Sequence, residues 1–236
     1  MNKLCVVLIC CLLAGCAGAP IVHFDRSKSV PHSITLVSVV QPKTNSVVNL
    51  GSAANAFALV GALIQAGIDK ANSDTYTNMV KRSNVSFSEI VTSSLKKQLE
   101  EKGYTVVLAN DVTVPLTADE KNFNYSSITA NTDAILHVWY TENGYISPLD
   151  STDYQPWVVI RARLIDSKSK ADLYLRTLAG GWTSEQENVT NVACGEQYRY
   201  SNFDELTKNS QQSVEGLRNC TQQIVARIAE DITPSH

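Results

Sequence analysis

The chain has 236 residues, of which 44% are hydrophobic and 18% charged, and its formal net charge is −3 at pH 7. A mildly acidic chain without a run of Lys and Arg lacks the basic surface that binds nucleic acid, so we exclude that class of partner. The length suffices for one large or two small domains with a substantial core.

The first sixteen residues have the pattern of a bacterial secretory signal. A lysine near the start is followed by an apolar run over residues 4–12, and the small residues Ala14 and Gly15 precede Cys16. The run is too short to span a bilayer, which takes ~20 apolar residues. Residues 13–16 (LAGC) resemble the lipobox of bacterial lipoproteins, in which the cysteine is acylated and becomes the first residue of the mature chain. The alternative is that Cys16 is one more cysteine of a cysteine-rich run.

The lipobox resemblance also implies a location. In the sorting rule of Gram-negative lipoproteins, Ala17 in place of Asp after the cysteine implies the outer membrane. We therefore expect a signal peptide over residues 1–15 and a lipid-anchored protein on the periplasmic face of that membrane. Stable anchoring takes more than one acyl chain, and the resemblance to lipoproteins implies an anchor of three. Residues 16–31 show no periodicity, so they predict a lipidated N-terminus and a tether that reaches at most ~50 Å.

Discounting the signal changes what the cysteines mean. Three of the six cysteines lie in the predicted signal peptide, and Cys16 carries the lipid, so Cys194 and Cys220 remain. An oxidising periplasm favours a disulfide between them, and a loop of ~26 residues gives a stabilisation of roughly 3 kcal/mol. The alternative is a pair of separately buried thiols. No Cys or His spacing typical of zinc ligands occurs, so no metal site is expected.

Residues 51–71 form the most apolar stretch after the signal and follow a predicted buried strand over residues 32–40. Propensity predicts a helix. A stripe of small residues at a spacing of four runs along it, formed by Ala54, Ala58, Ala62 and Ala66 with Gly61 beside them. Such a stripe allows close approach of another backbone. Because the run falls short of a membrane span, we expect a buried or subunit-interface helix, with insertion into lipid as the alternative.

The middle of the chain predicts a strand-helix-strand unit. Ser86 and Glu89 have the spacing of a capping box, apolar residues then follow on one face, and Gly103 stands where a helix ends. A short strand follows over residues 104–108, which indicates a crossover with parallel strands. Residues 110–133 predict a polar loop with a short helix around residues 126–131.

Three strands and a long helix complete the predicted domain. Residues 134–141, 157–165 and 172–179 alternate as strands, the last two as a hairpin, and helical spacing continues from Asn202 to the C-terminus. The expected fold class is α/β, an α+β sandwich with a mixed sheet, helices on one or both faces and a long C-terminal helix. We expect a single periplasmic domain over residues 32–236.

Arginine and aromatic side chains gather on one predicted face of this sheet. If the strands pair as neighbours, alternate residues share a face, and that face holds His137, Trp139, Arg161, Arg163, Tyr174 and Arg176. These residue types are enriched at protein interfaces. The prediction is a docking face for a protein partner or an anionic envelope polymer, and the alternative is an ordinary solvated or helix-covered face.

No catalytic motif stands out in the sequence. The chain lacks the nucleophile elbow, the Walker loop, the dinucleotide fingerprint and the zincin motif. Asp150 and Asp153 lie in a loop where they form turns, and a lone strand histidine such as His137 is far more often packed than catalytic. We expect neither enzyme activity nor a cofactor, and the sequence identifies no small-molecule ligand.

The order of elements behind the lipobox resembles the compact α/β domain of envelope lipoproteins and related proteins. Members are the TolB amino-terminal domain, the LpoB-type activators of penicillin-binding proteins, the PelC-type exopolysaccharide lipoproteins and the CsgG-type curli secretion channel. The segments that carry the resemblance are residues 32–40, 86–108, 132–135, 157–179 and 203–232. The resemblance is one of element order, so no functional residue is carried over from it.

This resemblance implies a function without catalysis. The expectation is an outer-membrane lipoprotein that assists assembly or export of an envelope structure through contacts with a protein partner. The alternative is a ring-forming component of a secretion channel, in which self-association through residues 51–71 contributes. The chain departs from the family in the apolar character of those residues and in lacking two amphipathic membrane hairpins.

Overall fold

The computed structural model describes residues 20–27, 30–51, 58–118, 122–183, 186 and 188–233, and within its first described helix it describes side chains from Ala66 onward. The strands are β1 (Ser33–Val37), β2 (Ser46–Asn49), β3 (Thr105–Ala109), β4 (Ala134–Ser147), β5 (Gln155–Asp166), β6 (Asp172–Gly181) and β7 (Val189–Val192). The helices are α2 (Ala58–Arg82), α3 (Phe87–Glu101), α4 (Phe203–Lys208) and α5 (Ser210–Asp231).

The strands form one mixed sheet in the order β3-β1-β4-β5-β6-β7, and β2 pairs with the far half of β4. β1 pairs in parallel with both β3 and β4, whereas β4, β5 and β6 are antiparallel neighbours. The α/β class, the parallel crossover and the hairpin of β5 and β6 are thereby confirmed. β4 is longer than predicted, because Gly144 leaves room for β2: a Cβ there would lie 1.9 Å from the Ser46 carbonyl oxygen.

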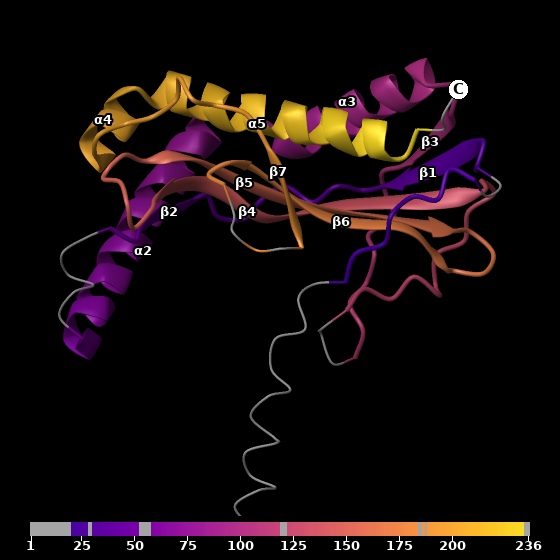
Figure 1. Cartoon of the computed structure of the whole chain (residues 1–236), viewed down its shortest axis with the longest axis horizontal. Coiled ribbons are helices and arrows are strands. Elements are labelled where there is room, and N and C mark those ends of the chain that lie inside the picture. The colour runs from indigo at the N-terminus through magenta and orange to yellow at the C-terminus, as the bar shows by residue number, and fades with distance from the viewer. Residues whose placement is uncertain are drawn as a thin grey trace, which may run out of the picture.

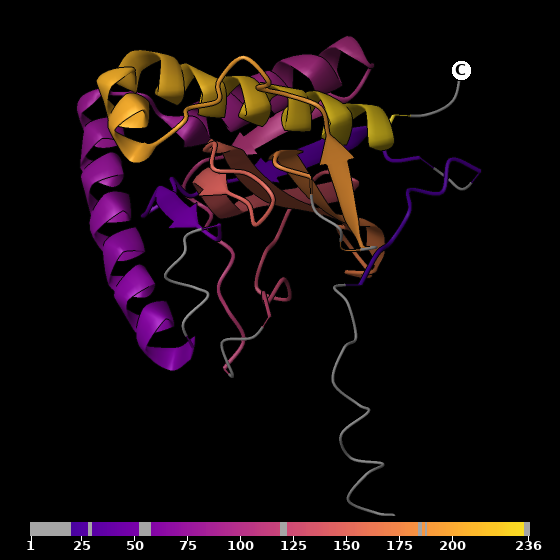
Figure 2. The same cartoon turned by 60° about the vertical axis from the view of Figure 1, so that its left-hand side comes forward.

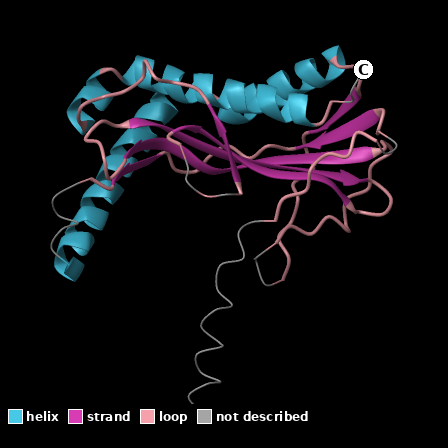
Figure 3. Cartoon of the chain, in the orientation of Figure 1, coloured by secondary structure: helices cyan, strands magenta, loops and turns pink. Residues whose placement is uncertain are grey.

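Helices α3 and α5 lie side by side over one face of the sheet (Figures 1 and 3). Each presents one apolar stripe to the main core, as an amphipathic surface helix does. In α3 the buried positions recur at every fourth residue, at Phe87, Val91, Leu95 and Leu99. The Ser86 hydroxyl accepts a hydrogen bond from the Glu89 amide at 3.3 Å, so this helix begins where the capping box predicts.

The predicted C-terminal helix is divided into two. α4 ends and α5 begins around Asn209, whose side-chain amide donates to the Glu205 carbonyl at 2.8 Å. The short helix predicted around residues 126–131 is absent, and turns take its place. Asn124 explains this difference, because its side-chain oxygen accepts from the Ser126 amide at 3.0 Å and so holds the backbone in a turn.

α2 is fixed to the edge of β2 by a ladder of side chains. Asp69, Ser73 and Thr77 follow each other at intervals of four residues, and they accept hydrogen bonds from the backbone amides of Asn49, Val47 and Asn45 at 3.3, 2.8 and 2.8 Å. The outer edge of a strand otherwise presents unpaired amides to solvent or to another chain. Because the ladder satisfies these amides, it holds the second half of α2 against the sheet.

The first half of α2 projects beyond the sheet (Figure 2). Its described side chains Ala66, Gly67 and Ile68 are exposed. The predicted burial of this helix in the chain's own core is therefore wrong at Ala66. Ala54 lies outside the described residues, as do the side chains of Ala58, Gly61 and Ala62, so the predicted interface role of the stripe stays a prediction. In the described part of the chain, none of the helices combines the length and apolar character needed to cross a bilayer.

The segment predicted as a tether packs on the domain wherever it is described. The Val22 amide donates to the Leu175 carbonyl at 3.0 Å, and the Leu175 amide donates back at 2.9 Å. Phe24 packs against the main core, and the Arg26 guanidinium donates to the Glu230 carbonyl at 3.1 Å. The predicted tether reach of ~50 Å is therefore wrong. Val22 is fixed to β6, Cys16 lies six positions before it, and a chain of that length spans ~20 Å at most.

Candidate interaction face

The sheet face opposite α3 and α5 carries four of the six residues predicted to share a surface. His137 pairs with Arg163 across β4 and β5, and Trp139 pairs with Arg161. The residues between them on each strand, such as Val138, point into the main core. Strand alternation therefore places two arginines, a histidine and a tryptophan together on the same side.

Ring contacts fix these four side chains in place. The Arg161 guanidinium lies 5.3 Å from the centre of the Trp139 ring, and that of Arg163 lies 4.7 Å from the Tyr125 ring. His137 stacks on Trp139 with ring centres 4.6 Å apart. Cations placed over aromatic faces are attracted by the negative ring quadrupole. We call these five residues the aromatic-arginine cluster.

Tyr125 enters this cluster from the loop after β3, together with Phe123, whose ring centre lies 4.5 Å from that of His137. Neither residue was among those predicted from the sequence to share this face. The available signal was the pair of aromatics, two positions apart, in an otherwise polar stretch. The same loop forms a second small apolar core on this face with Val114 and Ile128 against Ile135 of β4, so the face is partly covered.

The two arginines of the cluster differ in their partners. Arg163 forms a two-pronged pair with Asp172, and its Nη2 lies 3.0 Å from the Asp172 Oδ2. The Arg161 Nε is buried and has no hydrogen-bond partner among the described residues. A carboxylate neutralises the charge of Arg163, whereas the Arg161 guanidinium lies over the Trp139 ring and forms no ion pair with a carboxylate among the described residues. Arg161 is therefore the arginine of the cluster with capacity to bind an anionic group.

His137 is a packed residue of this cluster. Only 4% of its surface is exposed, and burial, aided by the positive charge of Arg163, lowers its pKa to about 3. The imidazole is therefore neutral at pH 7, and its Nδ1 shares a hydrogen bond of 2.9 Å with the Tyr125 hydroxyl. Burial likewise raises the pKa of Tyr125 to about 12. Neither group is poised for proton transfer at neutral pH.

Tyr174 and Arg176 do not join the cluster, so their predicted placement on its face is wrong. Arg161 pairs with Thr177, which puts Arg176 one position away and on the opposite face. A shift of one residue in strand register moves every side chain to the other face. The Tyr174 hydroxyl instead donates to Asp231 of α5 at 2.9 Å, and Arg176 lies 2.9 Å from His23.

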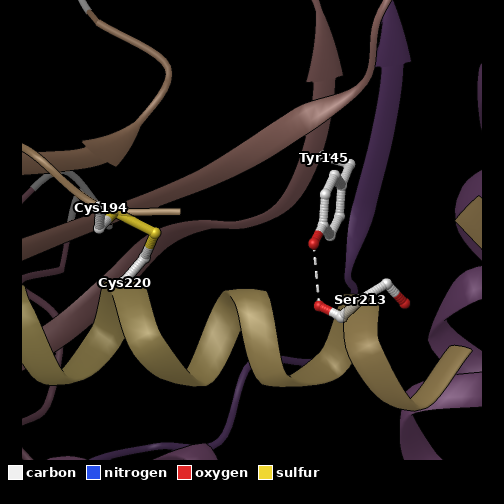
Figure 4. Close-up of a disulfide and its surroundings, with 4 residues drawn as sticks. All are labelled: Tyr145, Cys194, Ser213 and Cys220. Carbon is white, nitrogen blue, oxygen red and sulfur yellow. Dashed lines mark hydrogen bonds between the residues drawn. A yellow bond between two sulfur atoms is a disulfide. The ribbon is translucent and has the colours of Figure 1, made fainter. Parts of the chain in front are cut away.

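Cys194 and Cys220 are joined by a disulfide, as predicted, with Cα atoms 5.2 Å apart. It connects the segment after β7 to α5 (Figure 4). Nearer the start of the same helix, the Ser213 carbonyl accepts a hydrogen bond from the Tyr145 hydroxyl of β4 at 2.9 Å. The helix is thus held to the sheet at two separate points, and both lie on the face opposite the aromatic-arginine cluster.

Cys16, the predicted site of lipidation, lies outside the described residues. Within the described parts of the chain, no three His, Cys, Asp or Glu side chains come together as metal ligands would. The predicted absence of a cofactor remains an expectation from the sequence.

No protein-family model matches the sequence, and a search of curated proteins finds no match. Solved structures similar to the chain include lipoprotein GNA1162 from Neisseria meningitidis, with 18% identity and a TM-score of 0.34, covering 67% of this chain and 88% of that one. A PelC dodecamer from Paraburkholderia phytofirmans has 12% identity and a TM-score of 0.36, covering 92% and 96%. Protein XCC0632 from Xanthomonas campestris has 8% identity and a TM-score of 0.41, covering 85% and 82%. At these scores the similarities carry no argument about function.

Proposed function

We propose that the chain is an outer-membrane lipoprotein, anchored by acylated Cys16, that assists assembly or export of an envelope structure by binding a protein partner. The observation that carries the proposal is Arg161, whose buried Nε has no partner among the described residues and whose guanidinium lies over Trp139. Arg, Trp and Tyr are the residue types enriched among the few side chains that carry most of the binding energy at protein interfaces. The proposed partner therefore presents a carboxylate or another anionic group to Arg161.

The anchor is tested on the full chain in a Gram-negative host. Wild-type protein should carry acyl chains by mass spectrometry and fractionate with the outer membrane. A Cys16→Ala variant should lose both properties. An unacylated wild-type Cys16, or fractionation with the inner membrane, would contradict this part of the proposal.

The docking face is tested by in vivo cross-linking of the lipidated protein followed by purification. Arg161→Glu should abolish recovery of a specific partner, because a carboxylate replaces the guanidinium that meets the partner's anionic group. Arg218→Glu is the matched control, since Arg218 is 47% exposed on α5, beyond the opposite face of the sheet. Equal loss of the partner in both variants, or in neither, would contradict the proposed role of the cluster.

A ring-forming component of a secretion channel is the second candidate. The projecting first half of α2 favours it, because Ala66, Gly67 and Ile68 are exposed and leave apolar helix surface available for a second copy. Light scattering of the detergent-extracted protein separates the candidates. A stable assembly of many subunits supports the ring, and a monomer or dimer contradicts it.

A further inference from the structure

The projecting half of α2 is apolar around its whole circumference by composition. Residues 58–68 contain one polar residue, Gln65, and no charge. The first charged residue is Asp69, and it already accepts from the Asn49 amide. Ile68 at the end of this stretch is 47% exposed. A helix that is apolar on all sides is found in a protein core or in lipid, and the chain's own core leaves Ala66, Gly67 and Ile68 exposed.

A second exposed apolar residue lies at the same corner of the molecule. Leu149, in the loop after β4, is 78% exposed. That loop lies against the end of β2, because a Cβ on Gly51 would be 2.8 Å from the Pro148 carbonyl oxygen. The end of β2 is in turn bonded to α2 through Asn49 and Asp69. Ile68 and Leu149 therefore belong to one end of the sheet, and we call them the apolar corner.

The position of the anchor indicates what covers this corner. The first described segment, drawn in indigo, begins on the side of the sheet away from α3 and α5, and α2 projects toward that same side in both views (Figures 1 and 2). Val22 is bonded to β6, and Cys16 lies only six positions before it. A chain of this length spans ~20 Å at most. The bilayer that holds an acylated Cys16 therefore lies close to this side of the domain.

We propose that the projecting half of α2 and the apolar corner rest in the interfacial region of the bilayer that holds the lipid anchor. The inference rests on the proposed acylation of Cys16 and adds a second, non-covalent contact to it. A helix that lies in this region binds with a strength that grows with the apolar area it buries, and it does not need to span the membrane. Lys70, whose side chain is 77% exposed, lies two positions after the apolar stretch, and its long stem allows its ammonium to reach lipid headgroups. The domain then stands with α3 and α5 facing the periplasm.

The test uses a fluorescent probe on the full, lipidated protein. In the mature chain Cys16 is acylated and Cys194 is bonded to Cys220, so an Ile68→Cys variant has a single free thiol. An environment-sensitive fluorophore on it should shift its emission to the blue in phosphatidylethanolamine–phosphatidylglycerol vesicles, and brominated acyl chains should quench most of that emission. Lys97→Cys on α3 is the matched control, because its side chain is 76% exposed on the far side of the sheet. Its probe should stay unshifted and unquenched.

Two outcomes would overturn the inference, and a third would overturn its premise. An Ile68 probe that behaves like the Lys97 probe places α2 in water. A blue-shifted probe that brominated lipid does not quench, with disulfide-linked dimers of the unlabelled Ile68→Cys protein, places a second copy on this surface. Absence of acyl mass on the purified protein overturns the anchor and the inference together. An acylated, vesicle-bound protein with an unquenched probe overturns the inference alone.

Discussion

The two faces of the sheet are covered by different chemistry. On one face, α3 and α5 bury aliphatic side chains such as Leu217 and Ile224 completely, and the disulfide adds a covalent link. On the other, a loop without helices covers rings, a neutral histidine and two arginines. Aliphatic burial is non-directional and stabilising, whereas arginine and aromatic groups lend themselves to recognition. We therefore assign stability to the face covered by α3 and α5 and binding to the face that carries the aromatic-arginine cluster.

The largest effect is expected from a substitution that creates a cavity beneath α5, on the helical face. Ile224 is fully buried and packs toward Gly180 of β6, where an added Cβ would lie 3.1 Å from its side chain. Ile224→Ala should lower the free energy of unfolding by about 4 kcal/mol, because burial is lost and a cavity remains. Urea unfolding of the oxidised protein measures this. Ile68→Ala, the same substitution at an exposed site, should stay within ~0.5 kcal/mol, and equal losses would contradict the division.

Removal of the disulfide is expected to have the next largest effect. A Cys194→Ala, Cys220→Ala double variant should lose about 3 kcal/mol of its free energy of unfolding. The two cysteines are 26 positions apart, and without the cross-link the unfolded chain regains the conformational freedom of the loop between them. Reduction of the wild-type protein should lower its stability by a similar amount, and the double variant should be insensitive to reductant. A variant as stable as the oxidised protein would show that the non-covalent contacts of α5 suffice. Thermal unfolding with and without reductant measures both.

His137 gives the opposite face a stability that depends on pH in the acidic range. Its folded pKa is about 3, below the unfolded value of ~6.5. The unfolded state therefore binds the proton first, so stability is complete above pH ~6.5 and falls by ~1.4 kcal/mol for each unit below it, until pH nears the folded pKa. Urea unfolding at pH 7.5 and 5.0 measures the loss. A His137→Gln variant should lose less over that interval, and an unchanged slope would contradict a buried neutral imidazole.

The sequence predicted the helical face better than the opposite one. α3 carries a capping box and buries every fourth residue, two local signals that agree with its tertiary role. The pairing of β2 with β4 carries no such signal, because it depends on Gly144 letting Ser46 approach. The face of Arg176 depends on the register of β5 with β6, which residue types alone do not specify. Register and loop placement are long-range properties, and they decided which residues form the cluster.

The smallest expected change in stability is at Arg161. An Arg161→Ala substitution removes a partly exposed cation–π contact of about 0.5–1 kcal/mol, and it also removes a buried Nε that has no partner among the described residues. We therefore expect the free energy of unfolding to change by less than ~1 kcal/mol, while recovery of the cross-linked partner falls several-fold. Arg163→Ala should instead destabilise more, because it leaves Asp172 without its cation. A larger loss at Arg161 than at Arg163 would assign Arg161 to stability and remove the basis for a binding role of this face.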